Sequence, residues 1–153
     1  MVLRAALALQ RNGHGAGAEL QVTIENGALH WPLLWPAADL GAASQHDDNR
    51  ITEDGAEAIA LAVAHQAKTW RVVRRMQREE HADWLLEHTE YRARKLVAFE
   101  VSGVDQGSIV PRMREKLIQV AKSRDVDQRW AGVVGFQRPE AALRSAKKKS
   151  YGR

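Results

Sequence analysis

The segment between Lys95 and Ser102 places the tightest limit on what this chain can fold into. It contains four consecutive apolar residues, 96–99, with no alternation between polar and apolar positions. An unbroken apolar run of this length is typical of a strand that is buried on both faces of its sheet. Because such a sheet needs cover on both faces, the run predicts an α/β (α+β) fold in which a mixed sheet is flanked by helices.

A helix is expected at about 52–68, ahead of this strand. Thr52 is a good N-cap residue, and Glu53 and Asp54 follow it in the first turn, where the helix dipole favours negative charge. Apolar residues then recur at helical spacing: Ala56, Ile59, Ala60, Val63, Ala64 and Ala67. Since most of them are alanines, this helix can pack closely on the sheet.

The neighbouring segments complete a core with the order helix, strand, strand, strand, helix, strand, written αβββαβ, over residues 52–137. Apolar residues predict strands at 70–77, 81–88, 95–102 and 129–136. A second helix is expected to begin near Ser108, with Pro111 tolerated in its first turn. The residues expected in the core are Ile59, Val63, Trp84, Leu86, Val97, Phe99, Leu117 and Val133.

Both ends of the chain are expected to lie outside this core. Residues 2–9 and 19–25 alternate between apolar and polar positions around a glycine-rich loop, which predicts an N-terminal β-hairpin extension. The Trp- and Pro-rich segment 31–36 predicts a break in regular structure, either a loop pinned to the core or a partner-binding patch. Residues 37–49 predict a mobile linker, so that residues 1–50 form an extension and residues 138–153 a basic tail.

Composition narrows the function classes. The chain of 153 residues has no cysteine, so it has neither disulfide bonds nor thiolate metal sites. This fits a reducing compartment, and we expect a cytoplasmic protein without a signal peptide. No apolar stretch approaches the roughly 18 residues of a membrane span, so no membrane partner is expected. The net charge of +4 allows a nucleic-acid partner without requiring one.

Two acids are expected to meet at one end of the predicted hairpin formed by the second and third core strands. A loop centred on residues 90–92 pairs Trp84 with Phe99 and matches apolar residues across the hairpin, and the same register puts Asp83 opposite Glu100. Directly opposed like charges are unfavourable on a sheet, so a divalent cation, a basic side chain or a raised pKa should offset them. The alternative is that both acids sit at a solvated strand end.

The element order and these acids resemble the PD-(D/E)xK nuclease superfamily, the restriction-endonuclease-like proteins. The resemblance covers residues 52–137, with Ala82-Asp83 at the Asp motif and Glu100-Val101-Ser102 at the ExK motif. It implies that Asp83 and Glu100 bind Mg²⁺ or Mn²⁺ and that Glu57, from the first helix, is an auxiliary metal ligand. These motifs are short and degenerate.

This sequence differs from the family's motif at Ser102, which stands where the family has a lysine that helps to position the attacking water. Some members of the superfamily recruit this group from the following helix, which makes Lys116 and Gln119 the candidates. Arg112, Lys116 and Gln119 share one helix face by their spacing. The alternative is that this face is simply solvated.

Basic residues suggest where a nucleic acid would bind. Arg74 and Arg75 on the first core strand, together with Arg112, are the candidates for contacts with backbone phosphates. Because the arginines of this strand fall on both of its faces, at least one is expected to be the ion-pair partner of an acid.

The sequence therefore favours a divalent-metal-dependent DNA endonuclease, with Asp83, Glu100, Ser102, Lys116 and Gln119 as its catalytic residues. DNA is the expected partner, and a protein partner or a homodimer is left open. The alternative is a catalytically lapsed nuclease fold that serves as a nucleic-acid- or protein-binding accessory subunit, because the motif lysine is missing. A third hypothesis is a small regulatory protein whose acids cap a strand end.

Overall fold

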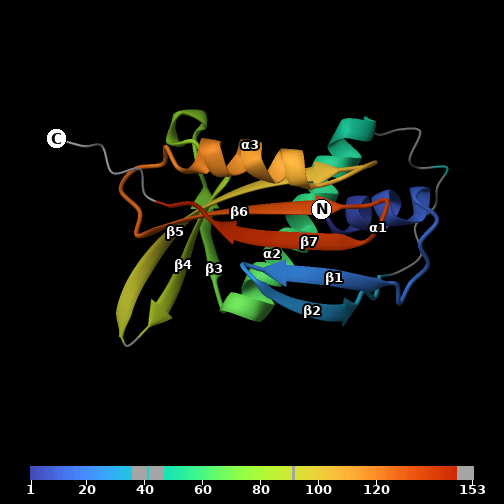
Figure 1. The fold of residues 1–153 in the computed structure, drawn as a ribbon, viewed down its shortest axis with the longest axis horizontal. Coiled ribbons are helices and arrows are strands. Elements are labelled where there is room, and N and C mark those ends of the chain that lie inside the picture. The colour runs from blue at the N-terminus through green and yellow to red at the C-terminus, as the bar shows by residue number, and fades with distance from the viewer. Residues whose placement is uncertain (36–40, 42–46, 91, 148–153) are drawn as a thin grey trace.

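The computed structural model describes residues 1–35, 41, 47–90 and 92–147. One mixed sheet of seven strands, in the order β2-β1-β7-β6-β5-β4-β3, has helices on both faces (Figure 1). The helical elements are α1 (Val2–Arg11), α2 (Asp48–Lys68), α3 (Val110–Val120) and the 3₁₀ turn η2 (Arg78–Glu80). The strands are β1 (Glu19–Ile24), β2 (Gly27–Pro32), β3 (Arg71–Arg75), β4 (Trp84–Glu90), β5 (Ala93–Val104), β6 (Gln128–Gly135) and β7 (Glu140–Ser145).

The predicted fold class is confirmed, and so is the αβββαβ order of the core. This core consists of α2, β3, β4, β5, α3 and β6, in which β3, β4 and β5 are antiparallel neighbours and β6 runs parallel to β5. The β4–β5 register is the predicted one, with Trp84 opposite Phe99. Apolar residues therefore fixed the register, because a shift of one position would have turned each of them to the other face.

The α2 helix begins earlier than predicted. Asp47 is its N-cap, and one carboxylate oxygen accepts hydrogen bonds from the backbone N–H groups of Asn49 at 2.8 Å and Arg50 at 3.2 Å. Thr52 is therefore a residue of the second turn, buried against the sheet, and not the cap. Although α2 has 21 residues, no helix within the described ranges is apolar enough over sufficient length to cross a bilayer.

The prediction of a strand at residues 2–9 is wrong, because these residues form α1. The segment is rich in alanine and leucine, which favour a helix, and its residues 5–9 are buried beside α2. The two helices approach so closely that a Cβ on Gly55 would lie 3.1 Å from the Cα of Ala5. The N-terminal hairpin exists, but it joins β1 to β2 across a turn at Glu25.

The predicted break at residues 31–36 is also wrong for its first two positions. Trp31 and Pro32 belong to β2, which is an edge strand of the sheet. Proline is tolerated there because an edge strand has one row of backbone groups without a partner strand. Most of the predicted linker, 37–40 and 42–46, lies outside the described residues, as does residue 36 of the preceding segment.

The prediction of a basic tail from residue 138 is wrong for residues 140–145. They form β7, which pairs antiparallel with β6 and parallel with β1, and so joins the N-terminal hairpin to the core in one sheet. The reason is visible in the segment itself, where Ala141 and Leu143 alternate with less buried residues and face the core. Residues 148–153 of that predicted tail lie outside the described residues.

Two apolar layers hold the sheet between its helices. The larger layer lies under α1 and α2, and the smaller one lies under α3. Seven of the eight predicted core residues are buried, and the eighth, Leu117, is partly buried against the smaller layer. β5 runs through the middle and contributes alternate residues to both layers, which places its polar residue Glu100 on the α3 side.

Candidate functional site

Asp83 and Glu100 lie next to each other at the end of the β4–β5 pairing. Trp84 and Phe99 form the last pair in the register. Asp83 and Glu100 are the next residues beyond this pair, one on each side of the β4–β5 hairpin. Asp83 is fixed by a hydrogen bond from the backbone N–H of Val101 to its Oδ2, at 2.8 Å. The predicted juxtaposition of the two acids is therefore present in the structure.

Glu100 is the most unusual residue of the pair, because only 1% of its surface is exposed. Its Oε1 accepts a hydrogen bond from Lys116 Nζ at 2.7 Å. Its Oε2 is buried and has no hydrogen-bond partner among the described residues. A buried carboxylate oxygen without a donor is costly, and such an atom in a native fold calls for a proton or a cation.

The pKa of Glu100 reflects this environment. Burial raises its pKa to about 7, and the negative charge of Asp83 pushes in the same direction. The ammonium group of Lys116 opposes both effects, and a hydrogen bond between the two carboxyl groups, which needs the proton on Glu100, adds to the rise. Around neutral pH, the pair can therefore hold either a shared proton or a cation.

The predicted helix-borne residues divide into two groups. Lys116 and Gln119 reach the site, since Lys116 Nζ donates to Gln119 Oε1 at 3.2 Å as well as to Glu100. Only 15% of the Lys116 side chain is exposed. Arg112 instead pairs at 3.5 Å with Glu115, and both of those side chains are largely exposed. The alternative of a solvated helix face therefore holds for Arg112 and not for Lys116.

Glu57 points from α2 towards the same acids, but an arginine already holds it. Arg75 forms two hydrogen bonds with its carboxylate, at 3.2 and 2.7 Å, while the guanidinium stacks over the ring of Trp84 at 4.3 Å. Burial is the main cause of a raised pKa for Glu57, with Arg75 opposing it and the charges of Asp83 and Glu53 adding to the rise. Arg71, Arg74 and Arg75 of this strand all form ion pairs with acids, as predicted for at least one of them. Arg75 is the arginine that pairs with Glu57, although 58% of its side chain remains exposed.

Ser102 is bound to an acid that the sequence analysis did not assign to the site. Its hydroxyl donates to Glu53 Oε1 at 3.2 Å, and the backbone N–H of Gly103 donates to Glu53 Oε2 at the same distance. The sequence could have indicated Glu53 as a site residue, because Glu53 and Glu57 are four residues apart and share a helix face. Glu53, Glu57, Asp83 and Glu100 are called the acid cluster below.

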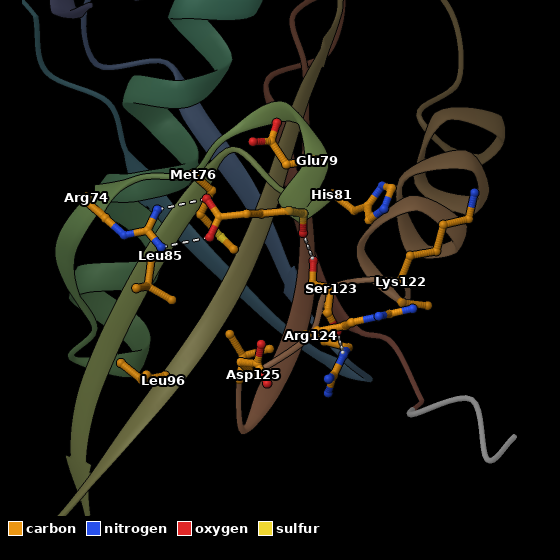
Figure 2. A pocket seen from close by; sticks show the side chains of 14 residues that line it. Arg74, Met76, Glu79, His81, Leu85, Leu96, Lys122, Ser123, Arg124 and Asp125 are labelled. Carbon is orange, nitrogen blue, oxygen red and sulfur yellow. Dashed lines mark hydrogen bonds and ion pairs between the residues drawn. The ribbon is translucent and has the colours of Figure 1, made fainter.

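Arg74 lies elsewhere. It makes two hydrogen bonds with Glu80 of η2, at 2.9 and 2.8 Å, and lines a cavity whose walls include no member of the acid cluster (Figure 2). The structure therefore brings together all five predicted catalytic residues and Glu57, and it separates Arg74 and Arg112 from them.

The acid cluster is not a finished metal site. Among the described residues, no group of three or more histidine, aspartate and glutamate side chains is arranged to hold a metal ion. Arg75 binds the carboxylate of Glu57, whereas Glu100 keeps one buried oxygen without a hydrogen-bond donor among the described residues. Mg²⁺ is commonly bound through one or two carboxylates, with the remaining ligands supplied by water and substrate phosphates, and this pair fits that pattern.

The charges of the site define what it can bind. When ionised, the four carboxylates of the acid cluster face two cations, Arg75 and Lys116, and the surplus is negative. A divalent cation would balance it.

Comparison with known proteins adds no family to this description: no family model, no curated protein and no solved structure matches the chain.

Proposed function

We propose that this protein hydrolyses phosphodiester bonds of DNA and that Asp83 and Glu100 bind the divalent metal ion, Mg²⁺ or Mn²⁺, that the reaction needs. The observation that carries the proposal is the buried Glu100 carboxylate, with a lysine on one oxygen, an acid beside it and no donor on the other oxygen. A purely structural glutamate at this position would be hydrogen-bonded on both oxygens or replaced by an apolar residue.

The metal would supply Lewis-acid polarisation of a phosphate oxygen and a lower pKa for an attacking water molecule. Glu57 would join Asp83 and Glu100 as an auxiliary ligand only after its carboxylate leaves Arg75, because both of its oxygens are engaged. Ser102 and Gly103 hold Glu53 in place beside them. The resemblance to PD-(D/E)xK nucleases agrees with this division of roles, with Glu53 as an addition.

Lys116 would take the part of the missing motif lysine. Its ammonium group is fixed by Glu100 and Gln119, so it presents a preorganised positive charge at the acid pair. Charge builds on the phosphate oxygens in the transition state, and a fixed cation stabilises that charge better than one that must be reoriented. Gln119 would keep the lysine in position and orient water.

DNA as the substrate is supported by the exposed guanidinium of Arg75 at the site and by that of Arg112, which lies apart from the site on the surface. Arg75 is half exposed and touches the acid cluster through Glu57. A phosphate that approached the metal would meet this guanidinium, which can form a two-pronged contact with phosphate oxygens. Arg112 is exposed on the helix that carries Lys116.

A second candidate function is DNA binding without cleavage. The ion pair between Arg75 and Glu57 favours it, because that pair satisfies a would-be metal ligand within the protein. In this case the fold would be a lapsed nuclease that acts as an accessory subunit.

The test is cleavage of single- and double-stranded DNA with Mg²⁺, Mn²⁺ or EDTA, together with calorimetric titration of both metals. We expect metal-dependent cleavage that is lost in Asp83→Asn and in Glu100→Gln, with metal binding weakened in both. Glu115→Gln, an exposed acid next to Lys116, is the matched control and should keep activity. Metal binding without cleavage would favour the second candidate. Cleavage that survives in the double variant Asp83→Asn/Glu100→Gln would refute the first.

A further inference from the structure

A cavity of about 790 Å³ lies on the α3 side of the sheet, between η2 and the turn that follows α3 (Figure 2). Its volume is within the usual range for pockets that bind small molecules, about 300–1,000 Å³. Its apolar lining comes mainly from Met76, Leu85, Leu96 and Val126. None of the acid cluster lines it, so it is distinct from the proposed metal site.

The cavity contains one buried charge, that of Arg129 on β6. This residue is only 9% exposed, and among the described residues its side chain makes one hydrogen bond, from Nε to the carbonyl of Ser123 at 2.7 Å. That bond satisfies a carbonyl just beyond the end of α3 and accounts for one of the five N–H donors of the guanidinium. Within the described part of the chain, no carboxylate lies at ion-pair distance from Arg129.

Glu80, a partly exposed acid on the wall, is already neutralised by an arginine. Glu80 receives two hydrogen bonds from Arg74 and one from the backbone N–H of Gln77 at 2.5 Å, and these contacts lower its pKa to about 2. Its backbone carbonyl accepts a hydrogen bond from the Ser123 hydroxyl at 2.8 Å, which ties η2 to the end of α3. The walls are therefore held in place without the four terminal N–H donors of Arg129.

The rim of the cavity adds no net charge of its own. Lys122 and Arg124 lie there with Glu79 and Asp125, and all four side chains are exposed to solvent. Figure 2 shows the two cations and the two acids around the opening. The uncompensated charge is therefore the positive one on Arg129, next to an apolar wall.

We propose that this cavity binds a small organic phosphate of nucleotide size. The phosphate would sit on the terminal N–H groups of Arg129, and the organic part would lie on Leu85, Leu96 and Val126. A phosphate offers three acceptor oxygens and between one and two negative charges, which suits the four terminal donors of Arg129 better than the two oxygens of a carboxylate. The inference does not depend on the proposed nuclease activity.

The experiment is calorimetric titration of the whole chain in EDTA, so that no metal at the acid cluster contributes. The probes are adenosine monophosphate, adenosine, inorganic phosphate and benzoate. We expect adenosine monophosphate to bind at least about tenfold more tightly than each of the other three, because only it combines the charged group with an apolar body. Equal binding of adenosine, tighter binding of benzoate, or no binding of the nucleotide would overturn the proposal.

Two variants locate the site. Arg129→Met keeps the length of the side chain and removes the donors, and it should weaken nucleotide binding at least about tenfold; Arg138→Met, at an exposed arginine, is the matched control and should not. Val126→Trp fills part of the cavity and leaves Arg129 in the sequence, so it provides a second test if Arg129→Met fails to fold. Unchanged nucleotide binding in either folded variant would place the ligand elsewhere and refute the inference.

Discussion

Lys116 Nζ lies 2.7 Å from Glu100 Oε1, so that a lysine of α3 reaches across to an acid in the middle of the sheet. Neither side chain is open to solvent, since 15% of the lysine and 2% of the glutamate side chain are exposed. A charge pair in such surroundings costs desolvation that its mutual attraction offsets only when the geometry is good. The pair therefore contributes little to stability, and two charged groups at a buried position are best explained if the site needs both of them.

The raised pKa of Glu100 predicts how stability depends on pH. In the unfolded chain this carboxyl titrates near its ordinary value of 4.5, and in the folded protein it titrates near 7. Between these values the folded state holds more protons than the unfolded state, so the free energy of unfolding should fall as the pH rises through this window, by on the order of 3 kcal/mol, and level off above it.

Glu100→Gln should remove this dependence, because glutamine does not titrate. The measurement is urea unfolding of both proteins in EDTA between pH 4.5 and 8, with the difference between them followed against pH. Loss of the contact between Glu100 and Lys116 lowers the free energy of unfolding by a nearly constant amount at every pH. The change of this difference with pH is therefore the quantity that tests the prediction. A difference that stays flat across the window would show that the Glu100 carboxyl is ionised throughout.

Arg75 is predicted to compete with metal for Glu57. Arg75→Gln removes a guanidinium that engages both oxygens of the glutamate and also takes a positive charge from the site. Both changes favour a divalent cation, so we expect Mn²⁺ to bind roughly tenfold more tightly. Calorimetry gives the affinity, and Arg78→Gln, at an exposed arginine three residues further along, is the matched control. Weaker metal binding in folded Arg75→Gln would mean that the arginine positions Glu57 for the metal.

Gly103 is predicted to set the distance between α2 and β5 and so the position of Glu53. A Cβ at this residue would lie 2.6 Å from the carbonyl oxygen of Thr52, which is backbone and cannot turn aside. Gly103→Ala should therefore destabilise the fold by roughly 1–3 kcal/mol and weaken metal binding. Gly15→Ala, with nothing within 4 Å of its new Cβ, should be close to neutral. Equal stability of the two variants, measured by thermal unfolding, would show that α2 moves freely on the sheet.

The sequence predicted the centre of the molecule well for a physical reason. In β4 and β5 the apolar residues admit one register, and that register alone brought Asp83 to Glu100. Lys116 and Gln119 were candidates because the resemblance to the nuclease superfamily pointed to the following helix, where helical spacing puts both residues on one face. Patterns of period two and period 3.6 carry this information locally.

What the sequence did not predict depends on contacts between distant segments. The alternating residues of α1 suit a strand as well as a helix, and only the packing of α1 beside α2 decides between them. β7 is short, half of its residues are alanine or leucine, and it becomes a strand because β1 and β6 flank it. Arg75 meets Glu57 only when β3 passes α2, so no local pattern marks it as the partner.

The last prediction concerns Ser102 and Lys116, which decide between an enzyme and a lapsed fold. If Lys116 supplies the catalytic cation, Lys116→Ala should lower metal-dependent cleavage by about 10²–10³-fold, the usual effect of removing one group that stabilises transition-state charge. Ser102→Lys should lower activity as well, because a second lysine on the same strand face as Glu100 would crowd the ammonium already bound there and would displace the contact with Glu53.

The double variant Ser102→Lys/Lys116→Ala separates crowding from loss of function. It returns a single lysine to the position that the nuclease motif uses, so it should recover part of the cleavage that Lys116→Ala loses. Lys122→Ala, an exposed lysine beyond the end of the same helix, is the control and should cleave like the wild type. In a lapsed fold the wild type would not cleave, and Ser102→Lys alone would create weak activity. Full activity in Lys116→Ala would remove this lysine from the mechanism and leave Gln119 as the helix-borne group that orients water.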